Sequence, residues 1–189
     1  MKFSKLIGVA LALVATSSQA TVLTFEDVGV QNSVFPYYTQ TGFVELGFQF
    51  SNNSDVVDLV GASWPYGAHS GEFAALNDFS GDMVITQFGG GLFYFQDTFI
   101  KGWANAGGAA ASITGYLGNT LVGQTNFTMG SDWQNIAGNF SSIDRLVISG
   151  GVFLVDDVTV NGNSVPEPAT LGLLALGLLG IGAMRKRQG

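Results

Sequence analysis

The middle of the chain is built from short stretches in which apolar and polar residues alternate. Phe48 and Phe50 fall on one face at a spacing of two, and Phe93, Phe95 and Phe99 recur at even spacing with polar residues between them. A period of two is the pattern of a β-strand with one face buried. The strands expected on this basis cover residues 22–26, 43–50, 73–76, 83–88, 92–103, 110–117, 120–127, 143–149 and 152–160.

Glycine and asparagine separate these stretches. Gly118-Asn119 is a favourable pair for a two-residue hairpin, Gly150-Gly151 separates the last two strands, and residues 52–55 form an expected turn. Between the two ends of the chain we find no convincing stretch of helical periodicity and no internal repeat. About nine short strands with glycine turns predict an all-β fold, a β-sandwich or jelly roll.

The first twenty residues have the layout of a secretory signal peptide. A short basic start is followed by an apolar run at 6–15 and by a small-residue cleavage pattern that ends at Ala20. Signal peptides have these three regions in this order. We therefore expect a signal peptide at 1–20, with Thr21 as the first mature residue. An ordinary buried N-terminal helix fits the pattern less well.

The C-terminal region, residues 165–189, has three parts. Pro166-Glu167-Pro168 is followed by an apolar run at 169–184 and then by Arg185-Lys186-Arg187. As a helix the apolar run at 169–184, which includes the sequence LGLLALGLLGIGAM, is about 24 Å long, slightly short of the hydrocarbon core of a bilayer. It can insert with local thinning, and the basic cluster favours a cytoplasmic C-terminus. The alternative is a plain membrane anchor. A β-domain at 21–164 is left between the two ends.

These three parts closely resemble the PEP-CTERM sorting signal of Gram-negative bacteria. The resemblance covers residues 165–187 and implies recognition by an exosortase, an integral-membrane enzyme that processes the tail near Pro166-Glu167-Pro168. It also implies a transient stay in the inner membrane, then a place at the cell surface or outside the cell, in association with exopolysaccharide and biofilm matrix. The motif residues, Arg185, Lys186 and Arg187 included, are recognition residues and not catalytic ones.

The charge of the middle region narrows the classes of partner. Thirteen acidic residues lie between Glu26 and Asp157, against two basic residues, Lys101 and Arg145. Phosphate backbones repel such a surface, so we expect no nucleic-acid partner. Divalent cations and neutral sugars remain compatible with it. The absence of cysteine excludes disulfides, thiolate metal sites and cysteine nucleophiles.

Three pieces of the domain resemble the jelly-roll frame of many carbohydrate-binding modules. They are residues 23–27, 69–76 and 153–160. In that frame the first and last strands lie close together, and a structural calcium ion is often held there by acidic residues and backbone oxygens. By this resemblance the candidate calcium ligands are Glu26, Asp27, Asp156 and Asp157.

Two considerations bear on the calcium hypothesis. Calcium takes six to eight oxygen ligands, which clustered carboxylates and backbone carbonyls can provide. Neighbouring residues of a strand point to opposite faces, so without a bulge only one of Asp156 and Asp157 can point into a given site. The alternative is that all four acids lie in solvated strand ends and turns.

Aromatic residues in loops are the candidates for binding sugars, because a flat ring can stack on the apolar face of a sugar. Trp64 and Tyr66 lie in the loop-like segment 62–69 and are the best of them. The further candidates are Tyr37, Tyr38, Trp103 and Trp133. The alternative, which holds for Trp103 at the end of an apolar strand, is a place in the core.

We expect no enzyme activity and no catalytic residue. His69 is the only histidine, Ser70 follows it directly, and no Gly-x-Ser-x-Gly elbow is present. The leading hypothesis is a non-catalytic protein of the cell surface or matrix, associated with exopolysaccharide. The second is a glycan-binding module with an aromatic platform. The third, and weakest, is a polysaccharide hydrolase or lyase with two facing carboxylates.

Overall fold

The computed structural model describes residues 20–31, 42–61, 64 and 66–162. Residues 19–163 form one compact unit. The signal segment, the C-terminal tail with its expected membrane helix, and the candidates Tyr37 and Tyr38 lie outside the described residues.

Twelve strands form two antiparallel sheets in the described part of the chain. The strands are β1 (Thr21–Leu23), β2 (Val44–Glu45), β3 (Phe48–Phe50), β4 (Ser54–Asp58), β5 (Phe73–Asn77), β6 (Met83–Gln87), β7 (Phe93–Gly102), β8 (Ala110–Leu117), β9 (Thr120–Thr128), β10 (Gln134–Ile143), β11 (Arg145–Ser149) and β12 (Phe153–Gly162). Sheet A has the order β10-β7-β12-β5-β4, and β1 also pairs with β12. Sheet B has the order β2-β3-β6-β11-β8-β9.

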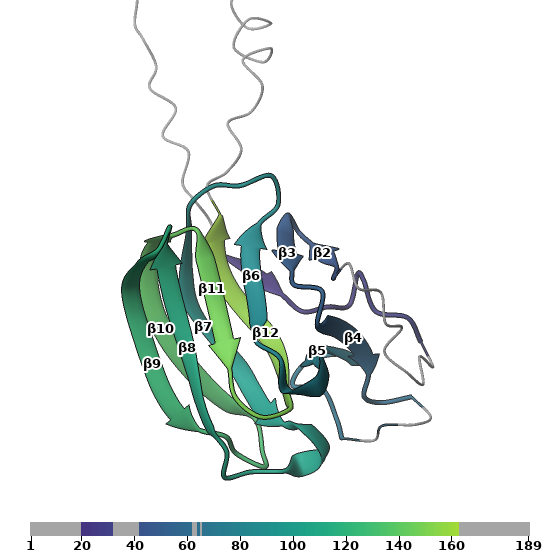
Figure 1. Ribbon diagram of the computed structural model, residues 1–189. Helices are drawn as coiled ribbons and strands as arrows, with labels where there is room; N and C mark the ends of the chain where they lie inside the picture. The colour runs from purple at the N-terminus through teal and green to yellow at the C-terminus, as the bar shows by residue number, and fades with distance from the viewer. Residues whose placement is uncertain (1–19, 32–41, 62–63, 65, 163–189) are drawn as a thin grey trace, which may run out of the picture. The chain divides into compact units, whose positions relative to one another are not determined.

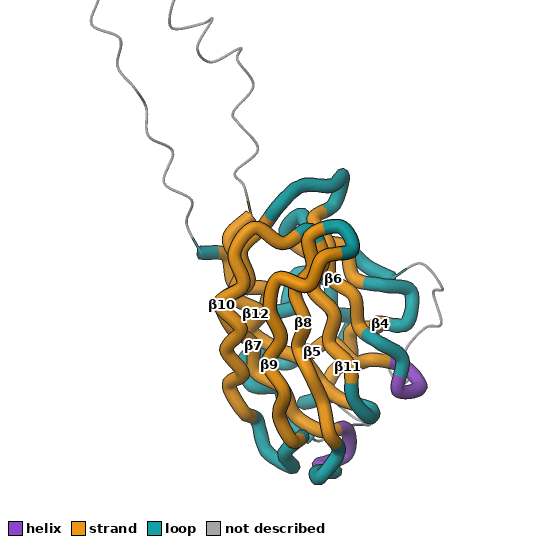
Figure 2. Tube along the Cα trace, turned by 60° about the vertical axis from the view of Figure 1, so that its left-hand side comes forward, coloured by secondary structure: helices purple, strands orange, loops and turns teal. Residues whose placement is uncertain are grey.

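The two sheets face each other as a sandwich, and the chain passes from one to the other again and again (Figures 1 and 2). From β6 onward the chain crosses from one sheet to the other at every connection except the β8–β9 hairpin. Two facing antiparallel sheets joined in this way form a jelly roll. The predicted fold class, an all-β sandwich, is therefore confirmed.

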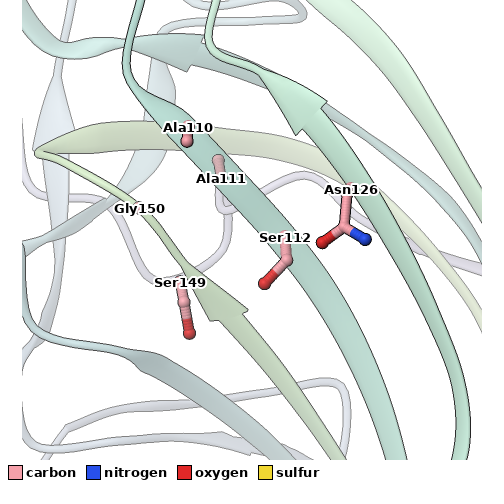
Figure 3. Close-up of a pocket in the computed structure, with 6 residues that line it drawn as sticks. All are labelled: Ala110, Ala111, Ser112, Asn126, Ser149 and Gly150. Carbon is pink, nitrogen blue, oxygen red and sulfur yellow. The ribbon is translucent and has the colours of Figure 1, made fainter.

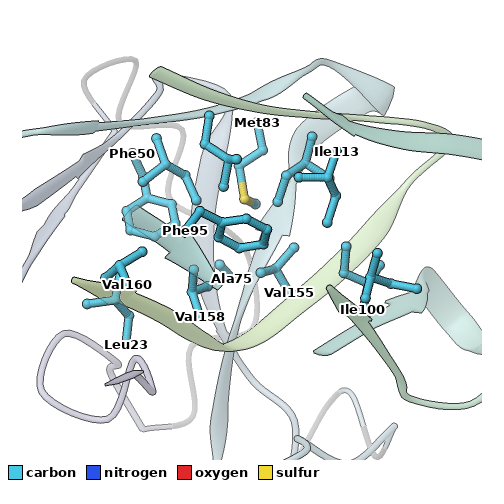
Figure 4. Packing of buried hydrophobic residues seen from close by; sticks show 14 of the residues in the cluster. Leu23, Phe50, Ala75, Met83, Phe95, Ile100, Ile113, Val155, Val158 and Val160 are labelled. Atoms are coloured by element: carbon cyan, nitrogen blue, oxygen red, sulfur yellow. The ribbon is translucent and has the colours of Figure 1, made fainter. Parts of the chain in front are cut away.

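Large apolar side chains fill the space between the sheets (Figure 4). Phe50 and Met83 come from sheet B and Phe95 and Val155 from sheet A, and none of the four has more than a trace of exposed surface. Their strands alternate inward and outward residues, so the core follows from the period-two pattern of the sequence.

The segment expected as a single strand at 43–50 is a hairpin instead. Strands β2 and β3 pair with each other, and Leu46 and Gly47 between them have φ of 44° and 84°. Two successive residues with positive φ make the tight turn that suits a two-residue hairpin. The sequence signal was weak because leucine rarely adopts this conformation, so only Gly47 marked the turn.

Two strands were not expected from the sequence. β4 begins at Ser54, inside the predicted turn at 52–55, and β10 runs through a polar stretch from Gln134 to Ile143. In β10 the register against β7 shifts twice, so Ile136, Phe140 and Ile143 are all buried although their spacing is four and three. The bulges replace the period of two that the prediction relied on.

Helical structure in the described residues is limited to two single turns of 3₁₀-helix, Asp78–Ser80 and Trp103–Asn105. No helix among these residues has the length and apolar character needed to cross a membrane.

Candidate functional site

The outer face of sheet A carries a second, smaller hydrophobic cluster. Val57, Leu76 and Leu154 belong to it, whereas their strand neighbours Ala75 and Val155 belong to the core between the sheets. The outer residues lie in line across the sheet, since Leu76 pairs with Leu154. An apolar outer face needs a cover. Trp64, Tyr66 and Ala68, which follow β4 in the chain, supply it together with Trp103 and Trp133.

All three tryptophans of the chain contribute to this cover. Trp64 and Tyr66 come from the segment after β4, Trp103 from the turn after β7 and Trp133 from the residue before β10. Each of the four rings packs against the cluster and keeps part of its surface exposed. We call these four residues the aromatic cluster. The structure thus brings the two leading candidates, Trp64 and Tyr66, together with Trp103 and Trp133.

Two rings of the aromatic cluster are close to a common orientation. The Trp64 and Tyr66 ring centroids are 6.3 Å apart with an interplanar angle of 31°. Trp103 supports both, 5.1 Å from Trp64 and 5.2 Å from Tyr66, and stands edge-on to Tyr66 at 77°. Edge-to-face contacts of this kind favour a fixed arrangement of rings.

Hydrogen bonds hold the backbone beside these rings. The Lys101 ammonium donates to the Tyr66 carbonyl at 2.7 Å, and the Trp133 indole N–H donates to the Gly67 carbonyl at 3.1 Å. Lys101 is 5% exposed, its Nζ lies 5.7 Å from the Trp133 ring centroid, and burial lowers its pKa. The rings are therefore positioned before any ligand arrives. No local feature of the sequence indicates that Lys101 is buried here.

A buried carboxylate anchors the far end of the same segment. Asp156, on β12, is fully buried and its Oδ2 accepts the backbone N–H groups of His69 and Ser70 at 2.9 and 3.0 Å. Its Oδ1 accepts the N–H of Asp157 at 2.8 Å. Burial raises the pKa of Asp156 to about 7, although these N–H donors act in the opposite direction.

A bulge turns the next carboxylate toward the same segment. The register of β12 against β7 shifts after Asp156, and Asp157 has a φ of 47°. Asp157 Oδ1 accepts the Ser70 hydroxyl at 2.7 Å, and its Oδ2 lies 2.6 Å from His69 Nδ1. The His69 ring stacks on Phe99, with centroids 3.5 Å apart. Both aspartates therefore accept hydrogen bonds from the same segment, residues 69–70. In a regular strand their side chains would point to opposite faces.

Of the other two calcium candidates, one reaches this segment. Glu26 Oε1 accepts the N–H groups of Glu72 and Phe73 at 2.9 and 3.0 Å, whereas Asp27 is exposed and lies on the first loop. Among the described residues, no three acidic or histidine side chains gather closely enough to hold a metal ion. The carboxylate oxygens that point at the segment already have partners, which are backbone N–H groups, the Ser70 hydroxyl and His69 Nδ1. Calcium therefore stays a prediction.

The arrangement does not contain a nucleophile–base pair. Ser70 and His69 both contact Asp157, on its two different oxygens, so the serine hydroxyl donates to a carboxylate rather than to the imidazole. A Ser–His–Asp triad requires the hydroxyl to meet the ring nitrogen. Here Asp157 fixes the segment and activates nothing.

One pair of carboxyl groups is in direct contact elsewhere. Asp55 is 8% exposed, and burial together with a hydrogen bond to Asp78 raises its pKa to about 7. Glycosidase carboxyl pairs are about 5 to 9.5 Å apart, because a sugar or water must fit between them. Asp55 and Asp78 are closer together than that, since the hydrogen bond from Asp78 contributes to the raised pKa of Asp55.

A shallow hollow of about 230 Å³ lies on sheet B (Figure 3). Ser149, Ser112 and Asn126 form a row across its three strands, and alanines and Gly150 line the rest. The hollow has hydroxyl and amide groups but no aromatic ring and no charge. The aromatic cluster is therefore the better candidate site.

Comparison with known families identifies the C-terminal tail. The PEP-CTERM protein-sorting motif matches residues 164–187, which confirms the interpretation of Pro166-Glu167-Pro168 and the basic end. The motif indicates export and sorting to the cell envelope or surface. The match does not extend into the β-domain. A search of curated proteins found no match.

Several solved structures are similar in fold. TmCBM61 in complex with β-1,4-galactotriose is 18% identical, covers 68% of this chain and 99% of its own, and has a TM-score of 0.39. The CBM22-1–CBM22-2 tandem domain of Paenibacillus barcinonensis Xyn10C is 14% identical over 83% of this chain and 49% of its own, with a TM-score of 0.44. The CBM22-1 and GH10 modules of the Clostridium thermocellum xylanase 10B are 13% identical to this chain. The match covers 61% of this chain and 26% of that one, with a TM-score of 0.37. The likeness to carbohydrate-binding modules predicted from sequence is one of fold alone.

Proposed function

We propose that this chain is an exported, non-catalytic surface protein whose β-sandwich binds a neutral polysaccharide through the aromatic cluster. An exosortase-type enzyme of a Gram-negative bacterium would process its tail, and the partner would be an exopolysaccharide outside the cell. The observation that supports binding is the gathering of Trp64, Tyr66, Trp103 and Trp133 on one outer face, each with part of its ring exposed.

The alternative explanation is that these rings only cover the outer face of sheet A, which they do. Two features favour a binding role in addition to this covering role. Trp64 and Tyr66 are tilted by only 31° from each other, which suits consecutive sugar rings. Their backbone is also held by Lys101, so binding would cost little ordering entropy.

The charge around the cluster favours a neutral ligand. Lys101 is the basic residue beside it, and its ammonium is buried and donates to a backbone carbonyl. Among its described residues, the cluster thus has no exposed positive charge that could bind the carboxylate of a uronate or a sulfate group. The excess of acidic residues in the domain repels acidic chains as well.

Binding is tested with the variants Trp64→Ala and Tyr66→Ala of the full chain. We expect the parent to be retained by insoluble polysaccharides and to bind neutral members of a glycan array. Either substitution removes one stacking surface, so we expect affinity to fall about tenfold, which corresponds to about 1.4 kcal/mol.

The matched control is Phe88→Ala, which removes another exposed ring, 64% accessible, from a different loop. We expect its binding to equal that of the parent. Melting curves for all variants separate loss of binding from loss of folding. If the folded parent binds no polysaccharide in the pull-down and no glycan on the array, the proposal is wrong.

Calcium at Glu26, Asp156 and Asp157 is a separate proposal and follows from the resemblance noted above. These three carboxylates hold adjacent parts of segment 69–73, where an ion would reduce their mutual repulsion. We expect EDTA to lower the melting midpoint and added calcium to restore it, because an ion bound only by the folded state stabilises it. An unchanged midpoint in both conditions would contradict calcium binding.

A further inference from the structure

Exposed apolar side chains are concentrated at one end of the sandwich. Among the described residues, ten large hydrophobic side chains are exposed, and eight of them lie in or beside the turns of a single end. The eight are Val22, Val44, Leu46, Phe88, Leu92, Leu117, Leu121 and Val122. Single exposed apolar residues are ordinary, but a group at one end marks an interaction surface.

The strand pairing places these turns together. Phe93, at the start of β7, pairs with both Ile143 and Gly162, so β10 and β12 end where the 88–92 loop returns. The Phe88 N–H donates to the Gly47 carbonyl at 2.8 Å, which joins that loop to the β2–β3 turn. In Figures 1 and 2 the β6–β7 loop and the end of β12 lie at the same end of the domain.

Five of these side chains lie in the turns of this end or within two residues of them. We call Leu46, Phe88, Leu92, Leu117 and Leu121 the exit face. Phe88 is 64% exposed, Leu46 57% and Leu121 55%. Branched and aromatic side chains in this position leave a large apolar area in contact with water.

Both ends of the domain leave from this same end. β1 begins at Thr21, which pairs with Val160 near the end of β12. From Gly162, only residues 163–168 precede the predicted apolar segment 169–184. Six residues span at most about 20 Å. When the segment is inserted in a membrane, Gly162, at the exit end, can therefore lie no farther than about 20 Å from the start of the segment.

The distribution of charge agrees with a lipid surface. The charged residues of the exit end are Glu45, which is buried, Asp144, which accepts the N–H of Gly118, and Arg145, which donates to the Gly118 carbonyl. The opposite end carries a group of acids: Asp55, Asp78, Asp82 and Asp132. The end that would approach the bilayer thus has little charge to desolvate.

We propose that the exit face rests on the membrane surface while the C-terminal segment is inserted. Its leucines and Phe88 lie in the headgroup region and hold the domain upright, and Trp103 and Trp133 lie at the other end. The proposal uses the predicted membrane segment but is independent of polysaccharide binding. Apolar tips of this kind bind weakly alone and effectively when a tether keeps them close.

The chain has no cysteine, so a single probe can be placed at will. The full chain is reconstituted in phosphatidylcholine vesicles that contain a lipid with a nitroxide on its headgroup. A fluorophore is attached at Asn119→Cys, in the β8–β9 turn of the exit end, or at Ser131→Cys, in the loop before β10. We expect the lipid to quench the fluorophore at position 119 and to leave the one at 131 bright.

The decisive comparison is the double variant Leu46→Ser/Phe88→Ser against Val60→Ser, whose valine is 58% exposed in another loop. We expect quenching at position 119 to fall by about half or more in the double variant and to stay unchanged in Val60→Ser. Melting midpoints verify that all variants are folded. Equal quenching in parent and double variant would overturn the proposal, because the tether alone would then position the domain. If quenching at position 119 is absent and two copies of the Asn119→Cys protein form a disulfide with each other, the exit face contacts a second copy of the chain. That result would also overturn the proposal.

Discussion

Replacement of Asp156 by alanine is expected to lower the free energy of unfolding by about 3 kcal/mol, because three partly buried N–H groups lose their acceptor. These are the N–H groups of His69, Ser70 and Asp157, and alanine provides nothing in their place. The change is measured by urea denaturation at constant pH. Partial proteolysis provides a second readout, since the segment carrying Trp64 loses its anchor and becomes easier to cleave.

Asp82→Ala is the matched control for this effect. It removes the same charge from an exposed position whose side chain holds no such network. We expect its stability to differ from the parent by less than about 0.5 kcal/mol. An Asp156→Ala protein as stable as Asp82→Ala, with the segment still resistant to protease, would show that Asp156 is not the anchor.

The second large effect is expected at Phe140, whose ring occupies a recess made by three glycines. Gly115 on β8, Gly123 on β9 and Gly138 on β10 each come so close that an added Cβ would lie 2.7 to 2.8 Å from the Phe140 ring. Phe140 is 7% exposed and contacts Phe95 in the core, with ring centroids 5.9 Å apart. Phe140→Ala would empty the recess, so we expect a loss of about 3 to 4 kcal/mol in the free energy of unfolding.

The recess also predicts that the effects of substitutions at Gly123 and Phe140 on the free energy of unfolding are coupled. Gly123→Ala alone is expected to destabilise the protein, because its methyl group meets the ring. In the Phe140→Ala background the same substitution is expected to cost nothing or to stabilise. The coupling is measured as a double-mutant cycle by urea denaturation. Additive effects would mean that the ring and Gly123 do not touch.

The candidate site could be predicted only in part from the sequence. Trp64 and Tyr66 were chosen because they lie in a loop, and the structure places them where a loop residue can be presented. Trp103 and Trp133 were only further candidates, with a place in the core as the alternative for Trp103, since nothing local links positions 39 and 69 residues away to Trp64. Their meeting depends on which strands pair and on the loop that crosses sheet A.

The two aspartates illustrate a limit of pattern-based reasoning. A regular strand would send Asp156 and Asp157 to opposite faces, and the sequence contains no glycine there to suggest a bulge. The bulge at Asp157 exists because the segment 69–70 offers donors for both carboxylates. Such a local conformation is stabilised by contacts with a distant part of the chain, so it is absent from the local sequence pattern.

By itself, the sequence determined the sorting tail, the all-β class and most of the strands, because sorting signals are read as linear sequence and strands follow a local period of two. Only the tertiary structure decided that the three tryptophans share one face, that Lys101 is buried beneath them, and that the exposed leucines and Phe88 stand where the chain leaves the domain. These features come from strand order and loop crossings between residues far apart in sequence. Long-range pairing is set by the burial of both sheet faces together, which no local window of residues contains.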